Sequence, residues 1–219
     1  MTKINELFDL EKTIAAELFA GKTYPWEVLP EIKDFIKKLG ATLSEEEFDH
    51  PSESVWIAKD AKVFPSAFIG SPCIIDHGAE VRHCAFIRES AIVGKNAVVG
   101  NSAELKNVVL FDGVQVPHYN YVGDSVLGYK AHMGAGSITS NVKSDKTNVV
   151  IKEPGFPHET GRKKVGAMLG DHVEVGCNSV LNPGTVVGRN SHIYPTSCVR
   201  GVIPADSIYK DKDNIVSKK

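Results

Sequence analysis

The chain has 219 residues, of which 42% are hydrophobic, and this is enough for one sizeable core. Its 25 lysines and arginines nearly balance its 27 aspartates and glutamates, so the formal charge of -2 leaves no broad basic field to hold a nucleic acid. We therefore expect a small-molecule or protein partner and no nucleic acid.

The N-terminal stretch and the cysteines indicate where the protein works. Residues 1–18 alternate charged with apolar residues instead of forming an uninterrupted apolar segment, and no run of the sequence approaches a membrane span. These features predict a cytoplasmic protein without membrane contact. The cysteines form no Cys-x-x-Cys pair and are too few for a disulfide framework in a chain of this length. We expect reduced packing residues at Cys73, Cys84, Cys177 and Cys198.

Helical spacing of apolar residues appears at 4–20 and 29–39, and Pro30 suits the first turn of the second helix. We assign residues 1–50 to a small helical cap and linker. An open end of a repetitive sheet exposes unpaired strand edges, so the expected role of the cap is to cover such an end.

From Val55 onward the chain repeats every six residues, with an aliphatic residue at each sixth position and a small residue four positions later. Neither a helix nor a half-buried strand has a period of six. The aliphatic positions are Ile57, Val63, Ile69, Ile75, Val81, Ile87, Val93, Val99 and Leu105, continued by Phe111, and in a second block Leu169, Val175, Leu181, Val187, Ile193 and Val199.

A period of six suits a short strand followed by a turn, and glycine often follows the aliphatic position, where a compact corner favours it. Three such units close a triangular coil, and successive coils stack about 4.8 Å apart. This all-β pattern predicts a left-handed parallel β-helix and resembles the bacterial transferase hexapeptide family over roughly three quarters of the chain. We assign the β-helix to residues 51–210 and a C-terminal tail to 211–219.

Residues 141–164 lose the repeat and carry proline, glycine and charge. A long insertion that leaves a rigid prism usually serves a site or a subunit contact.

Two cations are predicted to stack on one face of the prism. Arg88 and Lys106 stand 18 residues apart, and each directly follows an inward aliphatic residue. With no acidic residue at either position, the pair suits a phosphate, although it reads equally well as two solvated surface charges.

His118 follows a point where the register slips between Phe111 and Val116, so we expect it where the coil bulges. A neutral imidazole can take a proton from an attacking amine, although a lone histidine in a loop is more often structural. Tyr121 lies three residues on and can orient it. Residues 134–141 (GAGSITSN) add glycine-exposed amides that can bind a thioester carbonyl or an oxyanion.

The stretch VPHYNYVGDSVLGYKAHMGAGSITSN (116–141) resembles the acetyltransferase domain of the bifunctional N-acetylglucosamine-1-phosphate uridyltransferases, and still more the archaeal sugar-1-phosphate nucleotidylyltransferases. The family motif is histidine, two residues, Tyr-x-Gly-Asp, and then Gly-Ala-Gly-Thr-Ile-Thr-x-Asn. The matching positions are His118, Tyr121, Gly123, Asp124 and residues 134–141, with Ser137 for threonine.

The resemblance implies His118 as general base and places Tyr121 and Asn141 against a sugar substrate. It also assigns phosphate binding to Arg88 and Lys106. The segments 24–29 (YPWEVL) and 160–171 (TGRKKVGAMLGD) are similar to those proteins as well, which suggests Lys163 or Lys164 near a phosphate.

The chain also departs from the pattern. A second substrate-binding asparagine of the bacterial enzymes falls on His132, and the lysine that follows Asn141 is not at its usual spacing, although Lys143 and Lys146 lie close. We keep His132, Lys143 and Lys146 as substrate-site candidates and leave the acceptor open. Residues 1–50 offer no glycine-rich nucleotide loop, so we do not expect the chain to make a nucleotide sugar by itself.

The implied reaction transfers acetyl from acetyl-CoA, a cosubstrate, to the amine of glucosamine 1-phosphate or galactosamine 1-phosphate in nucleotide-sugar biosynthesis, with no metal required. The family assembles as trimers with sites between adjacent prisms, so we expect a homotrimer. By resemblance, acetyl-CoA lies along the prism edge at Ala135, Gly136, Gly176, Cys177 and Pro195.

Two alternatives stay open. A γ-type carbonic anhydrase builds a zinc site from three histidines on the same kind of helix, but His77 and His83 are six residues apart, hence on different faces, and no His-x4-His pair occurs. The other is a non-catalytic trimeric scaffold or nucleotide-sugar-binding module. His132 and the altered lysine spacing favour that alternative, whereas the intact His118 motif opposes it.

Overall fold

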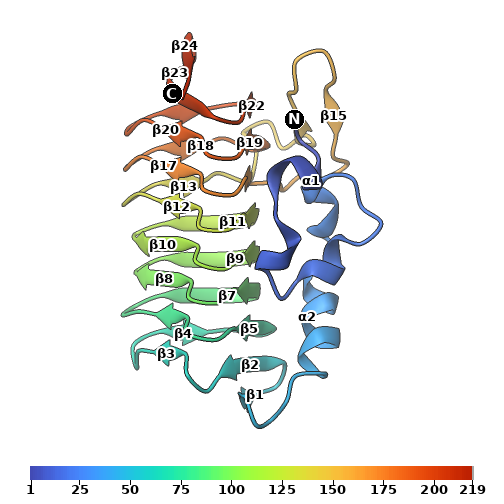
Figure 1. Ribbon diagram of the computed structural model, residues 1–219, viewed down its shortest axis with the longest axis vertical. Helices are drawn as coiled ribbons and strands as arrows, with labels where there is room; N and C mark the ends of the chain where they lie inside the picture. The colour runs from blue at the N-terminus through green and yellow to red at the C-terminus, as the bar shows by residue number, and fades with distance from the viewer. Residues whose placement is uncertain (219) are drawn as a thin grey trace.

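The structure is a computed structural model that describes residues 1–218. Most of this part of the chain winds into a parallel β-solenoid of about nine turns, which confirms the predicted left-handed β-helix (Figure 1). Within the described residues, a 13-stranded and a 9-stranded sheet run along the solenoid, and a small two-stranded sheet lies in the insertion. No helix of this part of the chain is long and apolar enough to cross a membrane.

The helical elements all lie near the N-terminus, and the strands follow them. The helices are α1 (Ile4–Leu7) and α2 (Ile32–Gly40), and the 3-10 turns are η1 (Leu10–Lys12), η2 (Ala16–Phe19) and η3 (Pro25–Val28). The 13-stranded sheet contains β1 (Phe48–Ser52), β2 (Val55–Ala58), β4 (Phe68–Ile69), β5 (Cys73–Ile75), β7 (Phe86–Val93), β9 (Glu104–Leu110), β11 (Tyr121–Leu127), β13 (Ile138–Thr139), β16 (Ala167–Leu169), β18 (Val180–Leu181), β19 (Thr185–Val187), β21 (Cys198–Val199) and β22 (Val202–Ile203). The 9-stranded sheet contains β3 (Lys62–Val63), β6 (Glu80–Val81), β8 (Val98–Asn101), β10 (Gln115–His118), β12 (His132–Met133), β17 (Glu174–Val175), β20 (His192–Ile193), β23 (Ser207–Asp211) and β24 (Asn214–Ser217). The insertion carries β14 (Val150–Ile151) and β15 (His158–Glu159).

The six-residue repeat fills the interior of the solenoid as predicted. Its aliphatic positions from Ile75 to Leu105 and from Leu169 to Val199 are at most 3% exposed. Stacking one aliphatic residue above another removes each from water on every coil, and this burial is the main stabilising contribution of the fold. Val63 is 37% exposed, because β3 is the edge strand of its sheet.

The number of residues between paired positions of neighbouring coils falls by one part-way along the solenoid. Ile87 pairs with Leu105, 18 residues on, whereas Val93 pairs with Leu110, only 17 residues on. The shift lies between Ile87 and Glu89, so the predicted slip between Phe111 and Val116 is wrong.

The six-residue count predicted that Phe111 continues the inward series. Because of the shift, it does not. Leu110 takes the inward place and stacks between Val93 and Leu127. The Phe111 ring is instead buried against two rings of the N-terminal segment (residues 1–47), with centroids 5.1 Å from Phe8 and 5.7 Å from Phe19.

The predicted helix over 4–20 is wrong, because that stretch breaks into α1 and two 3-10 turns. Between these short turns, part of its backbone bonds to the solenoid. The Asp171 carboxylate accepts from the Asp9 N–H at 2.8 Å, and the Asp171 N–H donates to the Leu7 carbonyl at 3.0 Å. The Asp112 N–H donates to the Lys12 carbonyl at 3.0 Å. The second predicted helix is confirmed as α2, shifted by a few residues.

The N-terminal segment lies along the side of the coils and does not cover an end of the solenoid (Figure 1). The expectation that it covers an open end is therefore wrong. The C-terminal end is covered instead by the antiparallel hairpin of β23 and β24, in which Tyr209 stacks on Ile193 and is 3% exposed. The predicted tail from 211 begins inside this hairpin.

The cysteines are free thiols, but only Cys73 is a buried packing residue. The expectation is wrong for Cys84, Cys177 and Cys198, which are exposed. They occupy turns or outward strand positions, where the alternation of the backbone directs side chains to the surface.

Replacing Phe111 with alanine tests the contact between the solenoid and the N-terminal segment. We expect Phe111→Ala to lower the free energy of unfolding by about 3–5 kcal/mol, because it leaves a cavity between the two parts. Urea denaturation measures the change. The control is Phe156→Ala, since Phe156 is 73% exposed and its loss should matter little. Equal effects of the two substitutions would show that Phe111 does not hold the segment.

Candidate active site

One corner of the solenoid stacks the predicted base beneath the predicted cofactor residues. The corner column consists of residues at equivalent points of successive coils. They are His118 at the end of β10 and Ala135, Cys177 and Pro195, which follow β12, β17 and β20. Backbone bonds join these coils at the corner, from Gly136 N–H to the His118 carbonyl at 3.0 Å and from Asn178 N–H to the Ala135 carbonyl at 2.8 Å. Neighbouring members therefore lie about 4.8 Å apart.

His118 ends β10 in regular register with Asn101 of β8, so the prediction that it sits on a bulge is wrong. The turn follows it, at Tyr119, whose φ is 53°. The His118 side chain is exposed, and among the described residues it makes no side-chain hydrogen bond. The imidazole is therefore available to a substrate at the surface of the corner.

The glycine-rich turn above His118 leaves one amide available. The Gly134 N–H donates to the Val175 carbonyl at 2.7 Å, and the Gly136 N–H donates to His118, so both hold coils together. Within residues 1–218, the Ala135 N–H has no hydrogen-bond acceptor. Of the amides of residues 134–136 in this turn, only that of Ala135 is free to bind an acyl oxygen.

A buried carboxylate organises the polar residues on the neighbouring face. Asp124 of β11 is 1% exposed and adopts a φ of 48°, at a bend where Asn107 and Ser90 of the preceding coils have φ of 56° and 54°. Its carboxylate accepts from Lys106 Nζ at 3.2 Å, Asn107 Nδ2 at 2.9 Å and Asn141 Nδ2 at 2.6 Å. Three donors satisfy the charge, as a buried carboxylate requires.

The structure brings Tyr121 and Asn141, the two residues assigned by resemblance to the sugar, into contact with each other. The Asn141 amide donates to the Tyr121 hydroxyl at 3.2 Å as well as to Asp124. Gly123 makes room for this contact, because a Cβ there would lie 2.4 Å from the Tyr121 hydroxyl. Partial burial raises the pKa of Tyr121, and the charges of Asp124 and Glu104 raise that pKa further, so the phenol keeps its proton and can donate.

The predicted stack of two bare cations is wrong. Because of the register shift, Lys106 pairs with Glu89, and Arg88 is the extra residue of β7. Arg88 Nη1 donates to Glu104 Oε1 at 3.1 Å, whereas Lys106 bonds to the buried Asp124. Each cation therefore has its own carboxylate.

The bend pocket lies between the N-terminal segment, the strand bends and the end of the insertion, and has a volume of about 510 Å³. Its lining includes Lys163, Lys164 and Lys106, and a phosphate near Lys163 or Lys164 stays a prediction. Sequence reasoning missed Lys33 and Arg162, which line the same pocket. Arg162 stood inside the quoted segment 160–171 and could have been found there, whereas nothing in the sequence points to Lys33 of α2.

Three predicted substrate residues lie elsewhere. His132 Nδ1 bonds to Glu174 Oε2 at 2.8 Å in a separate pocket on the 9-stranded sheet. Lys143 pairs with Asp145 of its own loop at 3.3 Å, and Lys146 is exposed on that loop. None of the three reaches the network around Asp124.

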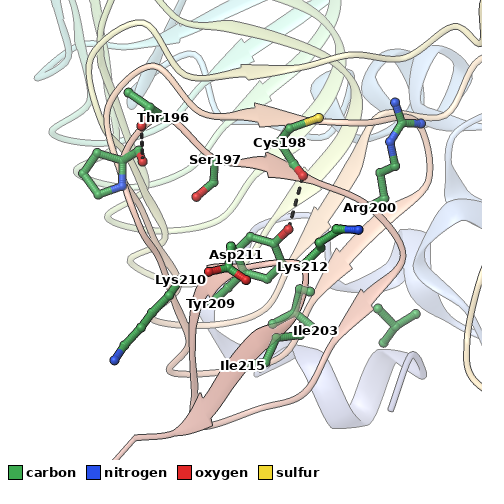
Figure 2. A pocket seen from close by; sticks show the side chains of 12 residues that line it. Thr196, Ser197, Cys198, Arg200, Ile203, Tyr209, Lys210, Asp211, Lys212 and Ile215 are labelled. Carbon is green, nitrogen blue, oxygen red and sulfur yellow. Dashed lines mark hydrogen bonds between the residues drawn. The ribbon is translucent and has the colours of Figure 1, made fainter.

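The remaining cofactor candidates adjoin the corner column. Gly136 and Gly176 flank it, and Gly176 packs so closely that a Cβ would lie 2.3 Å from the Pro195 nitrogen. Beyond Pro195 a second pocket, the C-terminal pocket, opens against the β23–β24 hairpin, with a volume of about 510 Å³. Figure 2 shows Tyr209 at its centre, where its hydroxyl donates to the Cys198 carbonyl at 3.2 Å, and Arg200 and Lys212 to one side.

The histidines considered for a zinc site bind other groups. His77 Nδ1 lies 2.9 Å from Asp60 Oδ1, and the His83 ring packs on Phe64 with centroids 4.5 Å apart. Within residues 1–218, no group of three or more histidine, cysteine, aspartate or glutamate side chains is placed to hold a metal ion.

Comparison with known proteins confirms the resemblance read from the sequence. Residues 69–154 match the family model of the GMPPB C-terminal domain. The chain is 35% identical to the bifunctional sugar-1-phosphate nucleotidylyltransferase/acetyltransferase of Sulfurisphaera tokodaii, over 49% of this chain and 27% of that protein. It is 33% identical to the bifunctional protein GlmU of Methanococcus maripaludis, over 53% of this chain and 28% of that protein. The matched part thus spans about a quarter of these relatives.

Among solved structures, the chain is similar to the acetyltransferase domain of PglB from Neisseria gonorrhoeae in complex with acetyl coenzyme A. The identity is 15%, the coverage is 86% of this chain and 66% of that one, and the TM-score is 0.33.

Substitutions at Asp124 test whether its carboxylate holds the network together. We expect Asp124→Ala to lower the free energy of unfolding by about 3–5 kcal/mol, because Lys106 would lose its buried counter-charge. Asp124→Asn keeps the shape and should cost less, about 1–3 kcal/mol. Chemical denaturation measures both, and Asp145→Asn in the exposed loop is the control. The organising role is refuted if neither Asp124 variant differs from that control.

Proposed function

We propose that the protein is an acetyl-CoA-dependent N-acetyltransferase that acts on an amino sugar 1-phosphate, glucosamine 1-phosphate or galactosamine 1-phosphate. The observation that carries this proposal is the corner column, in which an exposed imidazole stands one coil below the free N–H of Ala135. The Sulfurisphaera tokodaii relative, a bifunctional sugar-1-phosphate nucleotidylyltransferase/acetyltransferase, is 35% identical over 107 residues and supports the acetyl transfer.

In the proposed reaction, the unprotonated amine of the sugar attacks the thioester carbonyl carbon of acetyl-CoA. The carbonyl electron pair moves to oxygen, where the Ala135 N–H can donate a hydrogen bond to the oxyanion. His118 removes the proton from the new ammonium nitrogen. The C–S bond then breaks, and the sulfur leaves as a thiolate that takes up a proton, so that the products are the N-acetyl sugar phosphate and CoA.

The polar network beside the corner suits the acceptor. Tyr121 follows His118 by three residues across the turn, so a sugar that contacts Tyr121 and Asn141 would present its amine toward the imidazole. Lys106 carries a cation at the same face, held by Asp124, and is assigned the phosphate. Arg88 is paired with Glu104 on the neighbouring coil and is retained in the proposal as a second phosphate contact.

The upper part of the corner column suits acetyl-CoA. From Ala135 the cofactor would extend past Cys177 and Pro195 to the C-terminal pocket, where Arg200 and Lys212 provide cations for its phosphates. The small side chains of Ala135 and Cys177 leave room for a pantetheine chain along the edge.

A homotrimer is part of the proposal. The outer face of the 13-stranded sheet exposes Phe68 and Phe86, whose side chains are 59% and 42% accessible and whose rings lie 5.5 Å apart. Exposed aromatic pairs of this kind favour contact with another protein surface. A threefold assembly would bring a neighbouring chain to the exposed corner that carries His118.

A non-catalytic nucleotide-sugar-binding module is the second candidate, and the position of Lys143 favours it, because that lysine pairs within its own loop instead of with the site. Release of free thiol from acetyl-CoA in the presence of an amino sugar 1-phosphate separates the two, since a binding module releases none.

Removing the imidazole tests the base. We expect His118→Ala to abolish thiol release while the unfolding transition is unchanged, because the His118 side chain is exposed and packs against nothing that stabilises the coil. The control is His132→Ala, which removes a histidine outside the site and should retain activity. An unchanged rate in His118→Ala would rule out the assigned base.

A bulky residue in the corner column tests the path of acetyl-CoA. We expect Cys177→Trp to raise the KM for acetyl-CoA about tenfold or more, because the indole would fill the edge above Ala135. The matched control is His83→Trp. His83 lies at the same corner of the solenoid, two coils below His118 and on the side away from Ala135. The KM values come from initial rates at fixed acceptor concentration, and a similar KM in both variants would place the cofactor elsewhere.

A further inference from the structure

The bend pocket holds more positive charge than the Asp124 network uses. Lys33, Arg162, Lys163 and Lys164 line it, and none of the four forms an ion pair within the part of the chain from residue 1 to residue 218. The carboxylates in the lining are those of Glu89 and Asp124, and Asp124 is already bonded to Lys106, Asn107 and Asn141. With Lys106 the lining holds five cations against the two carboxylates Glu89 and Asp124, so the pocket carries a net positive charge that attracts an anion.

The guanidinium of Arg162 is unusual among these groups. Its Nε is shielded from solvent, yet it donates no hydrogen bond to any described residue. A buried donor without an acceptor costs free energy, so it points to an acceptor supplied from outside the chain. A phosphoryl group offers several oxygen acceptors to a guanidinium in the geometry that arginine favours.

The two walls of the pocket are held in place by contacts that need no ligand. The Asn107 amide donates to the Leu29 carbonyl at 3.2 Å, which fixes the chain just before α2 on the strand bend. On the other side, the rings of Tyr24 and Trp26 pack on His158 of the insertion, with centroids 4.6 and 5.6 Å away. The N-terminal segment thus anchors the insertion and presents Lys33 to the same space.

The pocket adjoins the proposed sugar site. The Asn141 amide donates to both the Tyr121 hydroxyl at 3.2 Å and the Asp124 carboxylate at 2.6 Å, so the two side chains lie on either side of one group. Lys106 belongs to both sites, since it bonds to Asp124 and lines the pocket. A sugar on Tyr121 and Asn141 would therefore direct its phosphoryl end between α2 and the insertion.

We propose that Lys33 of α2 and Arg162 of the insertion are specificity residues that bind the phosphoryl end of the acceptor, so that the N-terminal segment forms part of the substrate site. This inference rests on the proposed function for the identity of the acceptor, but the binding of a phosphoryl group can be measured without acetyl transfer. The same chemistry fits a sugar 1-phosphate and a nucleoside diphosphate sugar.

The central test compares Lys33→Ala with Lys37→Ala, since Lys37 lies one turn further along the same face of α2 and outside the pocket. Initial rates give KM and kcat for glucosamine 1-phosphate, and isothermal titration calorimetry gives the Kd of the same compound. We expect Lys33→Ala to raise both KM and Kd about tenfold with kcat nearly unchanged, because it removes a charge-assisted contact made equally before and during reaction. Lys33→Arg should restore binding, and Lys37→Ala should match the parent protein.

Two further acceptors identify what the pocket recognises. Unphosphorylated glucosamine should show the same KM in the parent protein and in Lys33→Ala, since it has no phosphoryl group to lose contact with. A nucleoside diphosphate glucosamine shows which phosphoryl group the pocket binds. If Lys33→Ala raises the KM of that compound more than the KM of glucosamine 1-phosphate, the pocket binds a diphosphate. If it raises it less, the pocket binds a monophosphate.

The outcomes separate this inference from the proposed function. Acetyl transfer with the same KM in Lys33→Ala and the parent protein would overturn the role of Lys33 and leave the transferase proposal standing. Calorimetric binding that depends on Lys33, without acetyl transfer, would support the phosphoryl site and refute the transferase. Absence of any binding of glucosamine 1-phosphate or the nucleoside diphosphate sugar to the parent protein would overturn the inference itself.

Discussion

The loss of one residue from the coil repeat shapes the polar face of this protein. Inward stacking of aliphatic residues fixes the spacing of the coils, so a shift between Ile87 and Glu89 moves every later outward side chain relative to the coil below. As a result Lys106 lies over Glu89, and the bends at Asn107 and Asp124 come into line. The hydrophobic core tolerates the change because Leu110 takes the inward place, and the consequence appears only on the surface.

Asp124 links that surface to the rest of the molecule. Its carboxylate bonds to Lys106 and Asn141, and it shares Asn107 with the Leu29 carbonyl of the N-terminal segment. A buried carboxylate with three donors is stabilising only while all of the donors are present, so the same contacts that fix the proposed substrate residues also help to dock the segment. Binding geometry and the packing of the N-terminal segment are therefore coupled through one side chain.

The repeat made the fold predictable from sequence, because a six-residue period has few structural solutions and the inward positions are independent of everything outside the coil. The corner column was predictable for the same reason, since positions that match in the repeat must match in space. Arg88 and Phe111 were misplaced because a deletion of one residue leaves the aliphatic pattern almost intact, with Leu110 and Phe111 both able to fill the next position. The N-terminal segment was mispredicted because its conformation depends on distant partners such as Asp171, and no local pattern reveals them.

The two halves of the proposed reaction rest on different kinds of structure. The acyl side lies on the corner column, where backbone ladders between coils hold His118 and Ala135 with no contribution from the appended segments. The acceptor side combines Lys106 and Tyr121 of the coils with elements that do not repeat, namely α2 and the end of the insertion, from which Lys33 and Arg162 line the bend pocket. A rigid repeat can keep the chemistry constant while such appended elements vary, because loops and terminal segments change without disturbing a stacked core. In the proposed site the coil residue Tyr121 holds the sugar, and Lys33 and Arg162 of the appended elements are the positions where variation would change the choice of phosphoryl group.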